Sequence, residues 1–300
     1  MNLKMKQAFI DHYDWLVETK KRYADKIGAD FQMYEYDEDY IKFHEEYSKK
    51  YPFLTDYNIV NKYKLHILDR LVNYKDEVLY LDFDAIPTTN ESFFDVWDLN
   101  KGIAILHNND KIRDPGQHIH RINGTIRSPS AKYFNAMAML EETDNKPQCD
   151  VVNTAIIGAT KEHWKKLKYF DDLKQSFDLM TYLKSDEYQS MYPPNITKTF
   201  GYDNETIFTY KLVANNVSVQ WLNYQWHFFY DNNRGIPQDA KIVHAINKEF
   251  ESNLSVLNGQ TLHAKSLGFL HPTKKKFVHF ESELPADFKK ILHLLEKLGD

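Results

Sequence analysis

The chain has 300 residues, of which 42% are hydrophobic, enough to bury the core of one large domain or of two closely joined ones. Its formal net charge of −5 gives no overall attraction to nucleic acid or anionic lipid, although it is compatible with a local basic groove. The single cysteine, Cys149, excludes an internal disulfide framework and a cysteine-built zinc or iron–sulfur site. We expect a cytoplasmic protein, because the chain begins without an apolar leader and contains no apolar run of membrane-spanning length.

Helices are expected wherever apolar residues recur at helical spacing between breakers. Gly28 ends the first helix, and Ser92 is placed to cap a short helical turn. Ser128 followed by Pro129 opens another helix, with a cap residue and then a proline at the first helical position. In chain order, the predicted helices cover 6–26, 57–74, 93–97, 128–142, 161–169, 175–183, 203–215 and 285–298.

Short, continuously apolar runs between these helices predict buried strands. Helices that alternate with buried strands are typical of an α/β domain with a mostly parallel sheet flanked by helices. We expect this domain to span residues 1–250, followed over 251–300 by a C-terminal helical extension that ends in an amphipathic helix. In chain order, the predicted strands cover 31–34, 78–81, 102–106, 151–158, 217–222 and 241–244.

An acidic pair, Asp82 and Asp84, directly follows the apolar run over 78–81 and precedes a breaker segment over 87–90. Carboxylates are poor strand formers and costly to bury, so a pair at the mouth of a buried strand requires a positive partner. A divalent cation supplies one, because Mn²⁺ or Mg²⁺ carrying a diphosphate takes hard oxygen ligands. The alternative is that one aspartate caps the next segment and the other is solvated.

Four short motifs then follow one another along the chain. Together with the upstream segment 23–30, their order resembles that of the GT-A glycosyltransferases, most closely the retaining family 8 pattern. The resemblance implies a Rossmann-like GT-A fold, a metal ion and a nucleotide-sugar donor, and the compact, signal-free chain also looks like a phage-encoded protein. The motifs are Asp82-Phe83-Asp84, the strand 153–158, the helix start 201–205 and the late segment 244–248.

The resemblance also implies a role for each matching residue. Asp82, Asp84 and His244 would hold the metal, and Asp82, Asn153 and Lys248 would contact the donor. Three residues that open a helix would lie beneath the sugar at the catalytic centre: Asp203, Asn204 and Glu205.

Some positions depart from the family pattern. The family's Asp-Gln pair is Asp203-Asn204 here, and its Gly-x-x-Lys segment after the late histidine is Ala-Ile-Asn-Lys, ending at Lys248. The family's first strand helps to bind the base and ribose, but residues 1–22 are expected to be helical, so no nucleobase pocket is assigned.

Each of these residues also has a structural alternative. His244 at the end of a short apolar strand is compatible with a hydrogen-bonded core histidine. Asp203 and Asn204 are suited to capping the helix that they open, and this role is compatible with a place in the site. Lys248 is compatible with an ordinary solvated lysine.

A polar stretch over 108–128 interrupts the predicted elements and is rich in positive charge. Such a loop offers a basic rim for an anionic acceptor or for the diphosphate, while a solvated loop is the alternative. Between residues 111 and 132 a single acid, Asp114, stands against five basic residues: Lys111, Arg113, Arg121, Arg127 and Lys132.

The function expected from these features is metal-dependent transfer of a hexosyl or pentosyl group from a nucleoside diphosphate, with UDP as the expected nucleotide, to an acceptor hydroxyl. Two acceptors stay open: a saccharide, or a hydroxymethylated base in phage DNA, which the basic loop would suit. The alternatives are a non-catalytic module that binds a nucleotide sugar or glycan, and a metal-dependent phosphohydrolase.

Overall fold

The computed structural model describes residues 3–107, 128–146, 151–188, 201–230, 236–248 and 250, and, nearer the C-terminus, 266–270, 272–273, 275–284 and 289. Its strands form a four-stranded sheet in the order β1-β4-β3-β5, a three-stranded sheet in the order β2-β7-β6, and the pair β8-β9. The strands are β1 (Glu77–Leu81), β2 (Ala85–Pro87), β3 (Ile103–His107), β4 (Val152–Thr160), β5 (Val219–Trp221), β6 (Phe228–Tyr230), β7 (Ile242–Ala245), β8 (Ser266–Leu270) and β9 (Phe277–Glu281).

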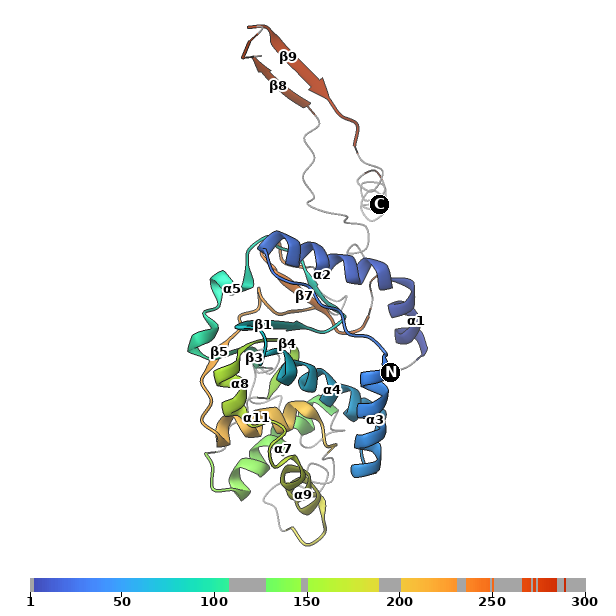
Figure 1. Ribbon diagram of the computed structural model, residues 1–300, viewed down its shortest axis with the longest axis vertical. Coiled ribbons are helices and arrows are strands. Elements are labelled where there is room, and N and C mark those ends of the chain that lie inside the picture. Colours follow the sequence, from blue (N-terminus) through green and yellow to red (C-terminus); the bar gives the residue numbers. More distant parts are fainter. Residues whose placement is uncertain are drawn as a thin grey trace, which may run out of the picture.

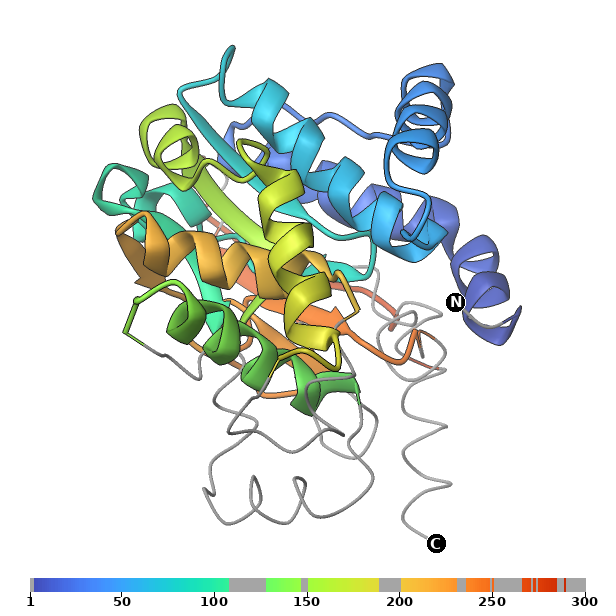
Figure 2. The ribbon, with the colours of Figure 1, turned by 90° about the horizontal axis from the view of Figure 1, so that it is seen from below.

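Helices cover the four-stranded sheet on one side and the three-stranded sheet on the other (Figure 1). The view from below shows α4, α7, α8, α9 and α11 spread across the first side (Figure 2). None of the described helices is long and apolar enough to span a membrane. The helices are α1 (Leu3–Asp11), α2 (Tyr13–Ile27), α3 (Glu38–Lys50), α4 (Asp56–Leu71), α5 (Phe93–Val96), α7 (Ser128–Glu142), α8 (Lys161–Leu167), α9 (Leu173–Lys184) and α11 (Asn204–Ala214), with a 3₁₀ turn over Leu99–Lys101.

Three clusters of buried side chains hold these layers together. The largest lies between the four-stranded sheet and the helices of Figure 2, with Leu68, Ile105 and Phe208 among its members. A second cluster fills the space between the two sheets, and a third packs the three-stranded sheet against α2 through Leu16 and Val243. The acidic pair lies between β1 and β2, so it sits where the chain passes from one sheet to the other.

The predicted α/β class is confirmed, but the described strands are not mostly parallel. Strand β4 runs antiparallel to both β1 and β3, and of the six described pairings β3–β5 and β6–β7 are parallel. The long apolar run of β4 arises because it is a central strand, buried on both faces. Burial on both faces gives an antiparallel strand the same sequence pattern that usually marks a parallel one.

The direction of β4 gives the sheet one edge at which several strands end. Because β1 and β3 are each antiparallel to β4, and β5 is parallel to β3, the carboxyl ends of β1, β3 and β5 lie at the same edge as the start of β4. Ligands of open α/β sheets bind at such carboxyl ends. This edge, called the ligand edge below, carries the candidate site.

The N-terminal region differs from its prediction in three places. The first predicted helix is divided at His12 into α1 and α2, with Gly28 closing α2 in a left-handed conformation as expected (φ 69°). Residues 31–34 form no strand, because this extended segment has no ladder partner among the described residues. Helix α3 was not predicted, although Asp37 caps it and lysines end it in the usual arrangement.

The described part of the C-terminal extension is a hairpin rather than a helix. Strands β8 and β9 pair with each other and lie apart from both sheets (Figure 1). The aromatic and β-branched residues Phe277, Val278 and Phe280 favour a strand, which explains the difference. The amphipathic helix predicted over 285–298 falls almost entirely outside the described residues, and the domain boundary at residue 250 stays a prediction.

Candidate metal centre

The acidic pair occupies the turn between β1 and β2. Asp82 extends β1 by donating its backbone N–H to Ala155 of β4 (2.7 Å), and its carbonyl accepts from the N–H of Ala85 (2.9 Å). Ala85 of β2 pairs with His244 of β7, and Asp84 accepts a backbone bond from the residue after His244 (3.0 Å). Two sheets therefore fix the turn, and they place His244 opposite the acidic pair.

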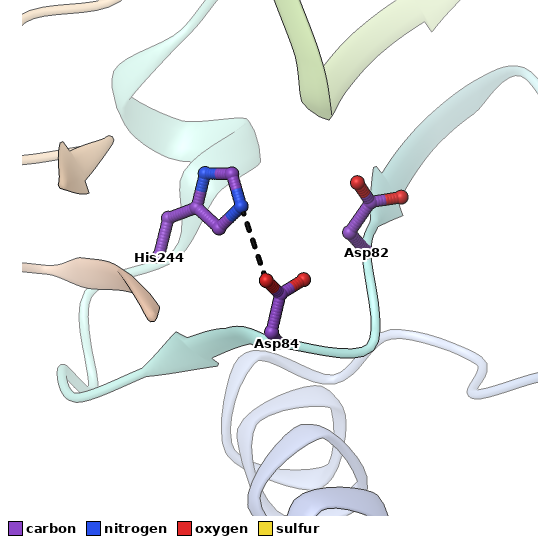
Figure 3. Close-up of side chains that lie close together, drawn as sticks. All are labelled: Asp82, Asp84 and His244. Atoms are coloured by element: carbon purple, nitrogen blue, oxygen red, sulfur yellow. Dashed lines mark ion pairs between the residues drawn. The ribbon is translucent and has the colours of Figure 1, made fainter. Parts of the chain in front are cut away.

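The side chains of Asp82, Asp84 and His244 converge, as Figure 3 shows. One potential ligand atom from each lies within 4.8 Å of the others. The Nε2 atom of His244 is 3.3 Å from Oδ2 of Asp84, and its Nδ1 atom is 3.1 Å from Nε2 of the buried His227. His227 therefore orients the His244 ring so that Nε2 faces the carboxylates.

Three lysines surround the same carboxylates. Lys248 forms an ion pair with Asp84, and Lys64 of α4 lies 3.2 Å and 3.1 Å from the two oxygens of Asp82. Lys20 of α2 donates to the carbonyl oxygen of Phe83 between the two aspartates (2.9 Å). Of these three lysines, only Lys248 was predicted from the sequence. One sequence signal could have indicated Lys20: it lies on the same apolar face of its helix as Leu16, where a lysine is unusual.

Burial and charge act together on the ionisation of this cluster. Burial of Asp84 opposes its ionisation, but His244 and Lys248 outweigh that effect and hold its pKa well below the ordinary value. Burial lowers the pKa of Lys20 to about 8, although Asp84 and Asp82 act in the opposite direction. Burial also raises the pKa of Tyr80, whose hydroxyl donates to Asp82 (2.7 Å), so this hydroxyl stays a donor.

The donor set fits a hard divalent cation. Two carboxylates and one imidazole nitrogen suit Mn²⁺ or Mg²⁺, and Asp82 is partly open to solvent whereas Asp84 and His244 are buried. Neighbouring side chains hold each of these three groups in place. Tyr80 and Lys64 bond to Asp82, Lys248 forms an ion pair with Asp84, and His227 bonds to His244. The geometry of Asp82, Asp84 and His244 is therefore compatible with the predicted metal site.

Lys248 has an unusual backbone conformation. Its φ is 57°, in the left-handed region that residues with a side chain rarely adopt. Its N–H donates to the carbonyl of Ala245 (2.9 Å), which closes the turn after β7 and returns the lysine towards Asp84. Residues held in this region are frequent at functional sites.

The predicted catalytic residues Asp203, Asn204 and Glu205 begin α11. Asp203 caps the helix, accepting from the N–H groups of Glu205 and Thr206 (3.0 Å each). The structural alternative for Asp203 is therefore present, and a catalytic role for the three residues stays a prediction.

Asn204 and Glu205 connect α11 to an irregular stretch of β4. The pairing with β3 jumps from Ile157 to Asn153, so the residues between them have no partner on β3. Glu205 accepts from the N–H of Thr154 (3.2 Å), and Asn204 donates to its hydroxyl (2.7 Å). Asn153 itself, predicted to meet the sugar, bonds to the N–H of Ala155 (3.0 Å), whose carbonyl accepts from Asp82. The four predicted motifs thus meet at the ligand edge.

The basic stretch cannot be placed in the same way. Lys111, Arg113, Arg121 and Arg127 lie outside the described residues. Lys132 belongs to α7, which starts at Ser128 as the sequence predicted. The proposed basic rim stays a prediction.

No protein-family model matches the chain, and no curated protein matches it. Among solved structures, it is similar to the crystal structure of the galactosyltransferase LgtC in complex with donor and acceptor sugar analogues, with 15% sequence identity and a TM-score of 0.30. The match covers 59% of this chain, and the chain spans 56% of the length of that galactosyltransferase. This similarity is too low to transfer any residue role.

Proposed function

We propose that the protein transfers a sugar from a nucleoside-diphosphate donor to an acceptor hydroxyl, with a divalent cation held by Asp82, Asp84 and His244. The observation that supports this most directly is the convergence of these three side chains at the ligand edge, within 4.8 Å of one another. A phosphohydrolase is less well supported, because two-metal hydrolases use more ligands than the three gathered in the described part of the chain.

The lysines suit a diphosphate leaving group. Three ammonium groups around two carboxylates leave the cluster with an excess of positive charge. The bond to the sugar breaks as negative charge develops on the diphosphate, and cations placed beforehand stabilise that charge most strongly. A bound cation would supply Lewis-acid stabilisation to the same oxygens.

The lysines would exchange partners when the donor binds. In the structure, Lys64 and Lys248 are bonded to the carboxylates that would hold the cation. Neutralisation of Asp82 and Asp84 by a cation would weaken these ion pairs, and the two ammonium groups would then turn to the diphosphate. Lys20 is buried against backbone carbonyls and would keep its place.

The proposal also covers the cation, the nucleotide, the stereochemistry and the acceptor. We take Mn²⁺ as the cation, UDP as the nucleotide and retention as the stereochemical outcome, with Asn153 and the start of α11 beside the transferred sugar. Both acceptors, a saccharide and a hydroxymethylated base of phage DNA, are compatible with the metal centre. A non-catalytic binding module is less well supported, because both members of the acidic pair are present.

The experiment is incubation of the full chain with Mn²⁺ and a panel of nucleotide sugars, followed by measurement of released nucleoside diphosphate. We expect release with one donor class, its loss with EDTA, and its loss in Asp82→Asn. The matched control is Asp76→Asn, at an exposed aspartate just before β1. Calorimetric binding of the nucleotide that is unchanged by EDTA would contradict the metal role, and absence of release with every donor would contradict the transferase.

A further inference from the structure

Two ring side chains lie at the ligand edge, away from the metal centre. His107 is the last residue of β3 and Trp221 the last of β5, and these neighbouring strands are parallel. The ring centroids are 5.0 Å apart with an interplanar angle of 83°, which is an edge-to-face contact. His107 thereby holds the Trp221 ring in one orientation.

Trp221 is exposed in spite of its size. Its relative exposure is 41%, whereas Ile105, its partner on β3, is completely buried. The Nδ1 atom of His107 is buried and has no hydrogen-bond partner among the residues that the structure describes. A buried polar atom without a partner costs stability and calls for an explanation. The position of Trp221 at the ligand edge, rather than its exposure alone, distinguishes it from other exposed rings such as Tyr36 and Tyr74.

The position of Trp221 relative to the acidic pair fits a second sugar. Strand β5 is three strands away from β1 along the ligand edge, with the start of β4 between them. Three strand spacings correspond to about 14 Å. The order along the edge is Asp82, Asn153, His107 and Trp221, so a donor sugar at Asn153 would lie between the metal centre and the indole.

The two described segments that carry His107 and Trp221 favour a neutral ligand. Neither β3 nor the segment 217–226 contains a lysine or arginine, and DNA binding depends on such cations; the basic stretch that follows His107 lies outside the described residues. The nearby amides of Gln220 and Gln225 donate to Asp98 and Asp239, so the surface that Trp221 offers to a ligand is the ring itself. A flat apolar ring is suited to stack on the apolar face of a sugar ring.

We propose that Trp221, held by His107, forms the binding site for a saccharide acceptor, with one face of a sugar ring stacked on the indole. This inference rests on the proposed function, because an acceptor site requires a transferase, and it names a saccharide as the acceptor class. Trp221 is then a binding residue, and His107 is a positioning residue that acts through it.

The first test is kinetic. With the donor identified above, acceptor-dependent transfer is measured against maltose, cellobiose and lactose for the wild type, Trp221→Ala and Trp221→Phe. We expect Trp221→Ala to raise the KM for the acceptor at least tenfold, and by much more than it changes the KM for the donor. Trp221→Phe keeps a stacking surface and should stay within a few-fold of the wild type. The control is Tyr182→Ala on α9, where the aromatic ring is equally exposed (42%).

The second test does not depend on turnover. Saturation-transfer NMR of the same three saccharides with the full chain, without donor, should show ring-proton signals that Trp221→Ala removes and Tyr182→Ala keeps. This result with no release of nucleotide from any donor would uphold the saccharide site and reject the proposed function. Three results would each overturn the inference. They are normal saccharide signals in Trp221→Ala, absence of saccharide binding by the wild type, and binding of an oligodeoxynucleotide, rather than a saccharide, that Trp221→Ala removes.

Discussion

Two buried charge clusters in this molecule are built in opposite ways. At the candidate metal centre, Asp84 is buried but bonded to His244 and Lys248, and its pKa is well below the ordinary value. On the other side of α4, Lys62 is completely buried, donates to the carbonyl oxygen of Tyr202 (2.7 Å), and forms no ion pair with a described carboxylate. Burial lowers the pKa of Lys62 to about 7, which the charge of Asp203 opposes.

The difference shows what burial does to a charge with and without a counter-charge. Opposite charges around Asp84 make its ionised form the stable one, so removal of the carboxylate leaves buried cations uncompensated. Burial makes the charged ammonium form of Lys62 unfavourable, so this side chain loses its proton easily. The amine nevertheless holds the turn before α11 through its bond to Tyr202. The first cluster suits the binding of a charged ligand, and the second suits the fixing of a loop.

The largest expected effect is that of Asp84→Asn. It removes a buried carboxylate that is the counter-charge of Lys248 and lies 3.3 Å from His244, so we expect the free energy of unfolding in urea to fall by about 3–5 kcal/mol. Asp82→Asn is the comparison, because the side chain of Asp82 is more exposed than that of Asp84 (26% against 5%), and the free energy of unfolding should fall by about 1 kcal/mol in this variant. Equal losses in the two variants would contradict the difference in burial on which this prediction depends.

The next effect is a pH dependence at Lys62. Below pH 7 the lysine is charged in both the folded and the unfolded state, and its burial cost is fully present. Between about pH 7 and 10 only the unfolded state binds the proton, so the unfolding free energy should rise by about 1.4 kcal/mol per pH unit. Lys20, whose pKa is about 8, adds a rise of its own above pH 8. Lys62→Met should therefore lose the rise between pH 7 and 8 and about 1.4 kcal/mol per pH unit of the slope above it, whereas Lys166→Met, at an exposed lysine of α8, should keep the full profile. Parallel pH profiles for the wild type and Lys62→Met would show that Lys62 is not titrating there.

A smaller effect is expected from His244→Ala. Loss of the nitrogen ligand should weaken Mn²⁺ binding by about tenfold or more, measured by calorimetry or by electron paramagnetic resonance of free Mn²⁺. His44→Ala serves as a control at a histidine of α3, outside the site. Unchanged Mn²⁺ affinity in His244→Ala would reduce His244 to a hydrogen-bonded core histidine.

The smallest effect separates the two roles of Asp203. Asp203→Ala removes the cap of α11 and should cost about 1 kcal/mol of unfolding free energy. Asp203→Ser restores a capping oxygen and should recover most of that stability. If Asp203→Ser is stable and still releases nucleotide at the wild-type rate, Asp203 is a cap and has no catalytic part.

The cluster of Asp82, Asp84 and His244 was largely predictable, because part of its signal is local in the sequence; its role in metal binding stays a prediction. Asp82 and Asp84 stand out as acids at the end of an apolar run, and the caps of α5 and α11 follow from Ser92 and Asp203. His244 and Lys248 were found through the order of motifs, and the structure brings both to Asp84.

The contacts that were not predicted depend on which helices and strands are neighbours in the folded protein. Lys64 reaches Asp82 from α4, and His107 meets Trp221 because β3 and β5 are adjacent, which no local pattern reveals. The parallel sheet was expected for a related reason: the apolar run of β4 records its burial and not its direction. Short strands such as β2 and β6, with three residues each, carry too little pattern to be predicted.

The central place of β4 has a consequence for how the protein forms during synthesis. In the described sheet β1 and β3 do not touch, so they stay unpaired on the ribosome until residues 152–160 have emerged between them. The site closes later still, since Lys248 follows Asp84 by 164 residues, on the order of ten to thirty seconds at the usual rates of elongation. Until β4 has emerged, the apolar strands β1 and β3 are open to wrong partners. Mutations in β4 should therefore lower the yield of folded protein more than their effect on the finished structure suggests.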